Sequence, residues 1–108
     1  MATRFDDIDP HERFVAQEYI KNPYLIDGLK CDFRIYVLVV GFDPLRVYIH
    51  EDGLTRFATT EYELPNRHNM HDMCMHLTNY AVNKRNPNFD HDEEDGHKRS
   101  LEWTYNYL

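Results

Sequence analysis

Glycine, cysteine and long apolar runs are scarce in this chain of 108 residues, and each shortage excludes a class of protein. The four glycines are not clustered, so the chain has no glycine-rich loop that could cradle phosphates. It also lacks a GxSxG motif and therefore the nucleophile of the α/β-hydrolases. Two cysteines, Cys31 and Cys74, are too few for a disulfide framework, and we expect a reducing compartment.

Targeting segments and an excess of cations are missing too. Residues 1–7 hold no apolar stretch like that of a signal peptide, and no apolar run approaches the ~20 residues of a membrane span. Lysine and arginine number 12 against 19 acidic residues, a net charge of −7, whereas a general nucleic-acid binder carries a basic surface. We therefore expect a cytoplasmic protein that binds neither nucleic acid nor membrane.

The sequence does contain a strong β-strand pattern over residues 29–40, which are rich in β-branched and aromatic side chains. Side chains alternate between the two faces of a strand. One face is entirely apolar and is expected to lie in the core: Cys31, Phe33, Ile35, Val37 and Val39. The other face begins with a polar series, Lys30, Asp32, Arg34 and Tyr36. Two interpretations of its charges are open: a cross-strand ion-pair ladder, or one end of a polar cleft that binds an anion.

The whole chain predicts a single small α+β domain, since 42% of its residues are hydrophobic and can supply a core. Strands are expected at residues 14–20, 30–41, 46–51 and 54–59. Turn-forming residues at 22–23, 27–28, 41–44 and 51–53 separate these strands and predict an antiparallel meander. Residues 61–71 form a polar loop, and residues 72–82 are ambiguous between strand and helix. A helix is expected from Lys98 to Leu108, with Leu101, Tyr105 and Leu108 on one face.

Candidate metal ligands lack the spacing of a known metal site. His68, His71, Cys74 and His76 contain no CxxC or HExxH pair, and we interpret these histidines as surface residues. The acidic run at residues 90–95 lacks the ligand spacing of a calcium loop and is interpreted as solvated. For the cations Lys98 and Arg99, two explanations are open: pairing with this acidic run, or binding a carboxylate or phosphate ligand.

Five motifs occur in the same order as in one known family. They are Gln17-Glu18-Tyr19-Ile20, the turn from Asn22 to Ile26, Lys30-x-Asp32-x-Arg34-Ile-Tyr-Val, Gly53-Leu-x-Arg56-Phe-Ala-Thr and His76-Leu-Thr-Asn-Tyr80, followed by Lys98-Arg99. Residues 14–108 thereby resemble the tubulin–tyrosine ligase-like family of ATP-grasp amino-acid ligases, which mostly add glutamate or glycine to tubulin tails. The resemblance implies that residues 1–108 are a single partial ATP-grasp domain, with both flanking parts missing and apolar hairpin surface left uncovered.

The resemblance also implies a role for each matching residue. Gln17, Glu18, Tyr19 and Ile20 correspond to the hinge strand that meets adenine, and Lys30, Asp32, Thr78 and Asn79 to further ATP contacts. Asp32 is expected to accept from ribose hydroxyls, with Lys30 on the phosphate side. Arg56, Tyr80 and Lys98 correspond to residues that hold the incoming amino acid. Ala81 stands where many glutamylating members have serine. The Mg²⁺ ligands of the family are expected beyond Leu108.

The implied reaction has two steps, in which ATP phosphorylates a carboxylate of the acceptor and the amine of the donor amino acid attacks the acyl phosphate. We expect a glutamate or glycine ligase that acts on microtubule tails in the cytoskeleton, cilium or flagellum, and that is inactive as this piece alone. Two other hypotheses are open. One is a non-catalytic module that binds nucleotide or tubulin, and the other is an acidic interaction domain whose motifs are relics.

Overall fold

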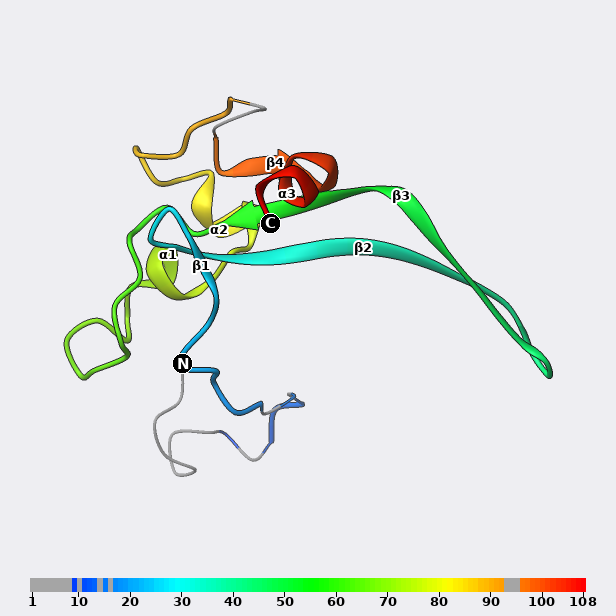
Figure 1. The fold of residues 1–108 in the computed structure, drawn as a ribbon. Coiled ribbons are helices and arrows are strands. Elements are labelled where there is room, and N and C mark those ends of the chain that lie inside the picture. The colour runs from blue at the N-terminus through cyan, green and yellow to red at the C-terminus, as the bar shows by residue number, and fades with distance from the viewer. Residues whose placement is uncertain (1–8, 10, 14, 16, 93–95) are drawn as a thin grey trace.

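The computed structural model describes residues 9, 11–13, 15, 17–92 and 96–108. Its elements in chain order are β1 (Leu25–Ile26), β2 (Leu29–Phe42), β3 (Leu45–Phe57), α1 (Met73–His76), α2 (Tyr80–Asn83), β4 (Lys98–Ser100) and α3 (Leu101–Tyr107). The strands form one antiparallel sheet in the order β1-β2-β3-β4, which confirms the predicted α+β class. Figure 1 shows a long curved hairpin, with α1 and α2 at the end where β2 begins and β3 ends.

The β2–β3 hairpin dominates the sheet. β2 confirms the strand predicted over residues 30–41, because its β-branched and aromatic side chains suit an extended, pleated backbone. The expected turn lies at Asp43–Pro44, which are joined by a cis peptide bond. The two strands expected at residues 46–51 and 54–59 are a single strand, β3, so the predicted turn between them is wrong.

Residues 50–52 form an irregularity in the ladder instead of a turn. Ile35 of β2 pairs with Gly53, whereas Val37 pairs with Ile49, so three residues of β3 lie opposite Tyr36. Both arms of β3 keep β2 as their partner. The ladder therefore holds this segment in the strand as a bulge, although its own sequence, Glu51-Asp52-Gly53, favours a reverse turn.

A tight turn leads from β1 into β2, as predicted. The φ angles of Asp27 and Gly28 are 54° and 75°, and two successive positive φ angles are typical of a type I′ hairpin turn. The strand expected at residues 14–20 is not formed in its described part, because residues 15 and 17–20 belong to no strand. Phe14 and Ala16 lie outside the described residues. The two-residue strand β1 takes the edge position beside β2.

The C-terminal helix begins at Leu101, three residues later than predicted, and Lys98–Ser100 form β4 against Leu54–Arg56 of β3. The hydroxyl of Ser100 accepts a hydrogen bond from the Trp103 amide at 3.0 Å, and this N-cap fixes where the helix starts. The helix buries Leu101 and Thr104. Of the three residues predicted to share one helical face, Leu101 is buried, whereas Tyr105 and the C-cap residue Leu108 are 64% and 69% exposed.

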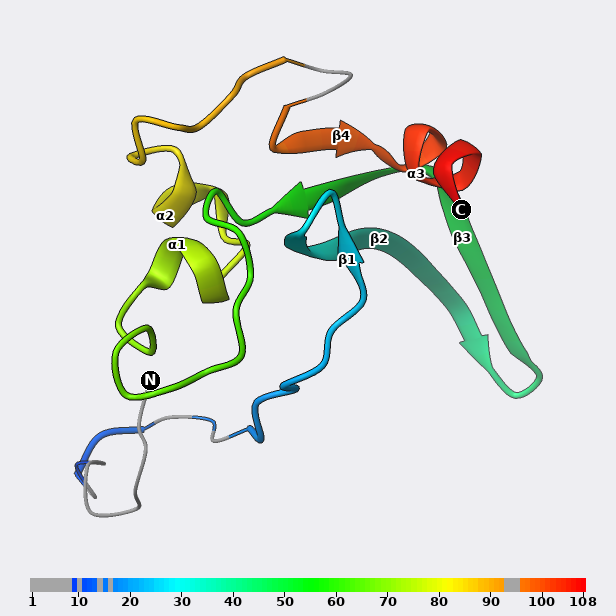
Figure 2. The same ribbon diagram turned by 60° about the vertical axis from the view of Figure 1, so that its left-hand side comes forward.

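The segment at residues 72–82, which the sequence leaves ambiguous, forms two short helices. Asp72 caps the first, because its carboxylate accepts from the amides of Cys74 and Met75 at 2.9 and 3.1 Å. Residues 77–79 separate α1 from α2. Figure 2 shows both helices beside the end of the sheet where β2 begins and β3 ends. His76 of α1 contacts Lys30 of β2, so α1 borders the face of the sheet on which Lys30 lies.

The core is small, and its buried apolar side chains are Ile26, Phe57, Ala58, Met75 and Leu101. Thr55 and Thr104 are both buried and share a hydrogen bond, and Leu101 packs against Gly53. Farther along the hairpin the expected core face is exposed: Phe33, Ile35, Val37 and Val39 are 46, 44, 55 and 42% exposed. The prediction that these side chains are buried is wrong, because no described segment packs on them. The expected uncovered hairpin surface is confirmed.

Replacing Gly53 with alanine is expected to destabilise the chain by about 1–3 kcal/mol, the usual cost of overpacking. A Cβ atom at this position would lie 2.7 Å from the Arg34 carbonyl oxygen and 2.9 Å from Cδ2 of Leu101. Urea denaturation measures the change. Gly41→Ala is the control, since its Cβ would lie 3.3 Å from its nearest neighbour, the Pro44 carbonyl oxygen. Equal stability losses in the two variants would contradict the prediction.

Candidate functional site

Three charged residues are directly paired across three neighbouring strands. Asp32 of β2 pairs with Arg56 of β3, and Arg56 pairs with Lys98 of β4. Paired residues of a sheet point to the same face. We call Asp32, Arg56 and Lys98 the charged row. The adjacent set Phe33, Thr55 and Arg99 points to the other face, where α3 packs on Thr55, so the charged row lies on the face that α3 leaves uncovered.

Asp32 and Arg56 form a bidentate ion pair. Nε of Arg56 donates to Oδ1 of Asp32 at 2.9 Å, and Nη2 donates to Oδ2 at 2.5 Å. The side chain of Arg56 is 26% exposed and that of Asp32 39%, and the hydrogen bonds to Asp32 raise the pKa of Arg56 above its usual value. The cross-strand interpretation of these charges is thus confirmed for this pair. Lys98 is exposed and has no ion-pair partner among the described residues.

Lys30 lies on the same face as Asp32, two residues before it in β2. Its ammonium group donates to the Tyr19 hydroxyl at 3.2 Å and to the His76 carbonyl oxygen at 2.9 Å. It also lies 4.3 Å from the centre of the Tyr19 ring. Burial lowers the pKa of Lys30, and the nearby charges of Tyr62 and Asp32 partly oppose that shift. These contacts hold Lys30 against the segment that contains Tyr19, which is not part of the sheet.

His76 connects three segments that are distant in the sequence. Its side chain is fully buried, Nδ1 lies 3.0 Å from the Tyr19 hydroxyl, and Nε2 lies 3.1 Å from the Asn69 carbonyl oxygen. The carbonyl can only accept, so Nε2 carries the proton and Nδ1 accepts from Tyr19. The Tyr62 ring packs edge-on against His76, and its hydroxyl donates to the Lys21 carbonyl oxygen at 2.6 Å. Burial, followed by the neighbouring Tyr19 hydroxyl, raises the pKa of Tyr62 to about 12.

Asn83 holds the segment between α1 and α2. Its side chain is fully buried and its Oδ1 accepts from the amide and hydroxyl of Thr59, at 3.0 and 2.8 Å. Its Nδ2 donates to the carbonyl oxygens of Leu77 and Asn79, at 2.8 and 3.1 Å. This network ties residues 77–79 to the end of β3. It leaves Asn79 exposed and Thr78 only 9% exposed.

Five of the residues expected to bind ligands share one face of the sheet: Tyr19, Lys30, Asp32, Arg56 and Lys98. His76 contacts Lys30 of this group through its carbonyl oxygen, and it is followed in the chain by Thr78, Asn79 and Tyr80. Tyr80 is 45% exposed and packs edge-on against Phe89. Gln17, Glu18 and Ile20 are exposed, and within the described residues only Tyr19 of this segment contacts Lys30.

The structural roles of His76, Tyr62 and Asn83 are not predicted by the sequence analysis. His76 belongs to one of the five motifs, but its spacing from Tyr19 and Asn69 carries no signal that its ring contacts the Tyr19 hydroxyl and the Asn69 carbonyl oxygen. The sequence predicts Arg99 at the start of a helix, but it lies in β4. It is buried, donates to the Gly96 carbonyl oxygen and to Asp27, and lies between the rings of Phe57 and Trp103. Arg99 therefore stabilises the packing of α3.

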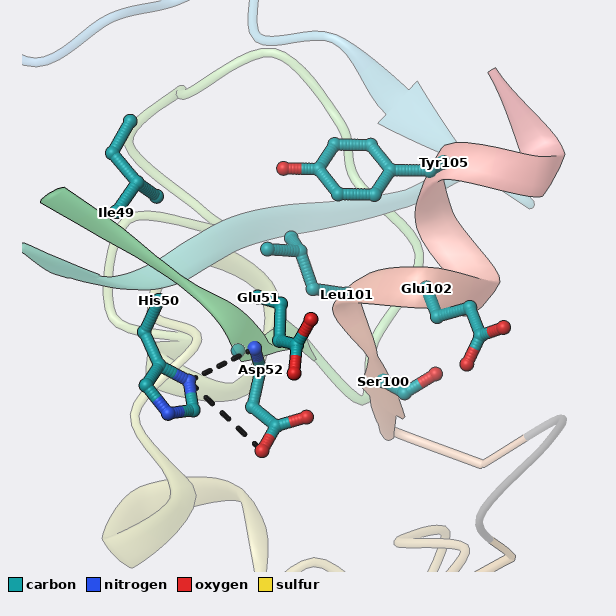
Figure 3. Close-up of a pocket in the computed structure, with 9 residues that line it drawn as sticks. Ile49, His50, Glu51, Asp52, Ser100, Leu101, Glu102 and Tyr105 are labelled. Carbon is teal, nitrogen blue, oxygen red and sulfur yellow. Dashed lines mark hydrogen bonds and ion pairs between the residues drawn. The ribbon is translucent and has the colours of Figure 1, made fainter.

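A concave region lies between the bulge of β3 and the start of α3. Its volume is about 610 Å³, and Figure 3 shows the side chains that surround it. They include three carboxylates, those of Glu51, Asp52 and Glu102. His50 Nδ1 accepts from the Asp52 amide at 3.0 Å.

In the described part of the chain no group of three or more histidine, cysteine or acidic residues could hold a metal ion. No helix there is long and apolar enough to cross a membrane.

Comparison with known proteins identifies the family of the chain. Residues 2–108 match the Tubulin-tyrosine ligase family, and the chain belongs to that family. It is 60% identical over 106 residues to a probable beta-tubulin polyglutamylase of Tetrahymena thermophila, covering 94% of this chain and 9% of that protein. It is 53% identical to Tubulin polyglutamylase TTLL13 of Mus musculus, covering 88% and 12%. It is 50% identical to Tubulin polyglutamylase TTLL6 of Homo sapiens, covering 94% and 11%.

The chain spans about a tenth of the length of these curated relatives. The antiparallel sheet with its C-terminal helix is consistent with part of the ATP-grasp-like α+β fold of the family.

Proposed function

We propose that this chain is the central part of an ATP-dependent ligase that adds glutamate, or glycine, to glutamate side chains of tubulin tails. In this proposal residues 1–108 are one partial ATP-grasp domain, and they do not catalyse without the rest of the protein. The observation that carries the proposal is the uncovered face of the sheet, where Lys30 and the charged row lie together. The names of the curated relatives supply the reaction class.

The residues present fit a nucleotide. Tyr19 offers an aromatic ring, Lys30 an ammonium group beside it, and Asp32 a carboxylate that can accept from ribose hydroxyls. The complete set proposed for ATP is Gln17, Glu18, Tyr19, Ile20, Lys30, Asp32, Thr78 and Asn79. When bound, ATP supplies the phosphoryl group that converts the acceptor carboxylate to an acyl phosphate, with release of ADP. Lys30, as a cation, binds and orients the phosphates.

The proposed amino-acid site is formed by Arg56, Tyr80 and Lys98. Two cations in paired positions suit the carboxylate of an amino acid, and the Arg56 fork provides two parallel donors for it. In the second step the amine of the bound amino acid attacks the acyl carbon and inorganic phosphate leaves. The site holds the donor so that its amine faces the acceptor, and this positioning replaces a chance encounter in solution.

The described residues do not provide a Mg²⁺ site, since no group of three or more potential ligands comes together in them. In this proposal the Mg²⁺ ligands belong to other parts of the complete protein. The proposed partners are tubulin tails, ATP and the donor amino acid. The proposed place of action is the cytoplasm, on the cytoskeleton, cilium or flagellum.

The test uses the complete protein with tubulin, ATP and radiolabelled glutamate or glycine. We expect ATP-dependent transfer of label to tubulin, and Lys30→Met is expected to raise the KM for ATP by about tenfold or more, because a charged contact is lost. Lys21→Met is the control. The Lys21 side chain is exposed and makes no contact with Lys30 or Tyr19, and the Lys21 carbonyl oxygen that accepts from Tyr62 is unchanged in the variant. ATP binding without transfer of either amino acid would instead establish a non-catalytic nucleotide-binding module.

A further inference from the structure

We propose that Asp32 positions Arg56 to bind the carboxylate of the donor amino acid. A residue assigned to the nucleotide would then also determine recognition of the second substrate. This inference rests on the proposed function. Its structural basis is the charged row, in which Asp32, Arg56 and Lys98 occupy directly paired positions on β2, β3 and β4.

The ion pair leaves a defined part of Arg56 for a ligand. An arginine side chain has five N–H donors in a planar fork, and Asp32 takes one on Nε and one on Nη2. Two donors on Nη1 and one on Nη2 remain. Because the fork is rigid, fixing its Nε edge fixes the direction of the Nη1–Nη2 edge as well. That outer edge presents two parallel donors, the arrangement that a carboxylate accepts.

The charges of the row favour one bound carboxylate. Arg56 and Lys98 are directly paired, and like charges in paired positions repel each other. Asp32 neutralises one of the two cations, so the row keeps one positive charge in excess. A single carboxylate beside Arg56 and Lys98 would balance that charge and relieve the repulsion. Glutamate and glycine both carry such a group next to the amine that reacts.

Asp32 can serve both substrates at once. Each of its oxygens accepts one hydrogen bond from Arg56, and a carboxylate offers about four acceptor positions in all. Ribose hydroxyls can therefore bind Asp32 while the pair with Arg56 stays intact. The ion pair links the nucleotide site on β2 to the amino-acid site on β3 and β4. Loss of Asp32 is then expected to disturb amino-acid binding even when ATP is saturating.

The experiment measures the KM of both substrates for Asp32→Asn in the complete protein. Asparagine replaces one carboxylate oxygen by an NH₂ group, which cannot accept from the fork. We expect the KM for the transferred amino acid, at saturating ATP, to rise about tenfold or more while kcat changes less than about threefold. In an Arg56→Lys background, which has no fork to orient, adding Asp32→Asn is expected to raise that KM by less than about twofold.

Asp27→Asn is the matched control, because it weakens another aspartate–arginine pair, that of Asp27 with Arg99. Its KM values should equal those of the wild type. Should Asp32→Asn fail to fold, Asp32→Glu keeps the charge but shifts the carboxylate, and it must also raise the amino-acid KM. An unchanged amino-acid KM with an increased ATP KM overturns the inference and leaves the proposed function standing. A wild-type protein that transfers no amino acid overturns both.

Discussion

Replacing Asn83 with aspartate is expected to lower the free energy of unfolding by about 3–5 kcal/mol at neutral pH. The Nδ2 group donates to two carbonyl oxygens in a fully buried position. A carboxylate there loses both hydrogen bonds and places a negative charge against the same two oxygens. Because Asn83 joins residues 77–79 to Thr59, which lies two residues beyond the end of β3, this loss separates the segment that carries Thr78 and Asn79 from the sheet.

Urea denaturation of the two proteins measures this effect. Asn86→Asp is a matched control three residues later, since the Asn86 Oδ1 only accepts from the Asn88 amide and a carboxylate can do the same. Acid should reduce the Asn83→Asp deficit, because a protonated carboxyl group is neutral and regains one donor. A neutral-pH loss below about 1 kcal/mol would show that the Asn83 network is not needed to hold residues 77–79.

Replacing Arg56 with methionine is expected to reduce kcat/KM for the donor amino acid by about 100-fold or more. The variant removes the outer donors proposed for the substrate carboxylate. It also leaves the partly buried Asp32 without its two hydrogen bonds. The full reaction of the complete protein with tubulin gives the kinetic constants, and calorimetry with ATP tests whether the nucleotide still binds.

The control for the Arg56→Met variant is Arg34→Met. Arg34 lies two residues after Asp32 in β2, on the same face of the sheet, and its exposed side chain lies against the Tyr36 ring. Removing this cation changes the net charge by the same amount without touching the ion pair. A similar loss of kcat/KM in both variants would mean that general electrostatics, rather than the Arg56 fork, accounts for amino-acid binding.

The sequence predicts those features of the fold that depend on local preferences. β2 follows from its run of β-branched and aromatic residues, and the turn at Asp27–Gly28 follows from two residues that tolerate positive φ angles. The bulge in β3 is not predictable in this way. Residues 51–53 have the composition of a turn, but pairing of both arms of β3 with β2 outweighs it. Tertiary pairing also places Lys98–Ser100 in the sheet instead of the helix.

The candidate site is only partly predictable for the same reason. The polar face of residues 30–34 follows from strand periodicity, and the structure adds the pairing of Asp32 with Arg56, which is 24 residues away in the chain. The contacts of His76 with the Tyr19 hydroxyl and the Asn69 carbonyl oxygen join three segments of the chain. Periodicity describes one element at a time, so it gives no signal for such a contact.

The charged row makes binding at this face sensitive to ionic strength. It is a small positive site in a chain whose net charge is −7. Salt screens exposed charges over a Debye length of about 10 Å at 0.1 M. Adding salt weakens attraction of a small anion to the row, but it also reduces repulsion between this acidic chain and any acidic polypeptide. Small and macromolecular substrates of one site would then respond to salt in opposite directions.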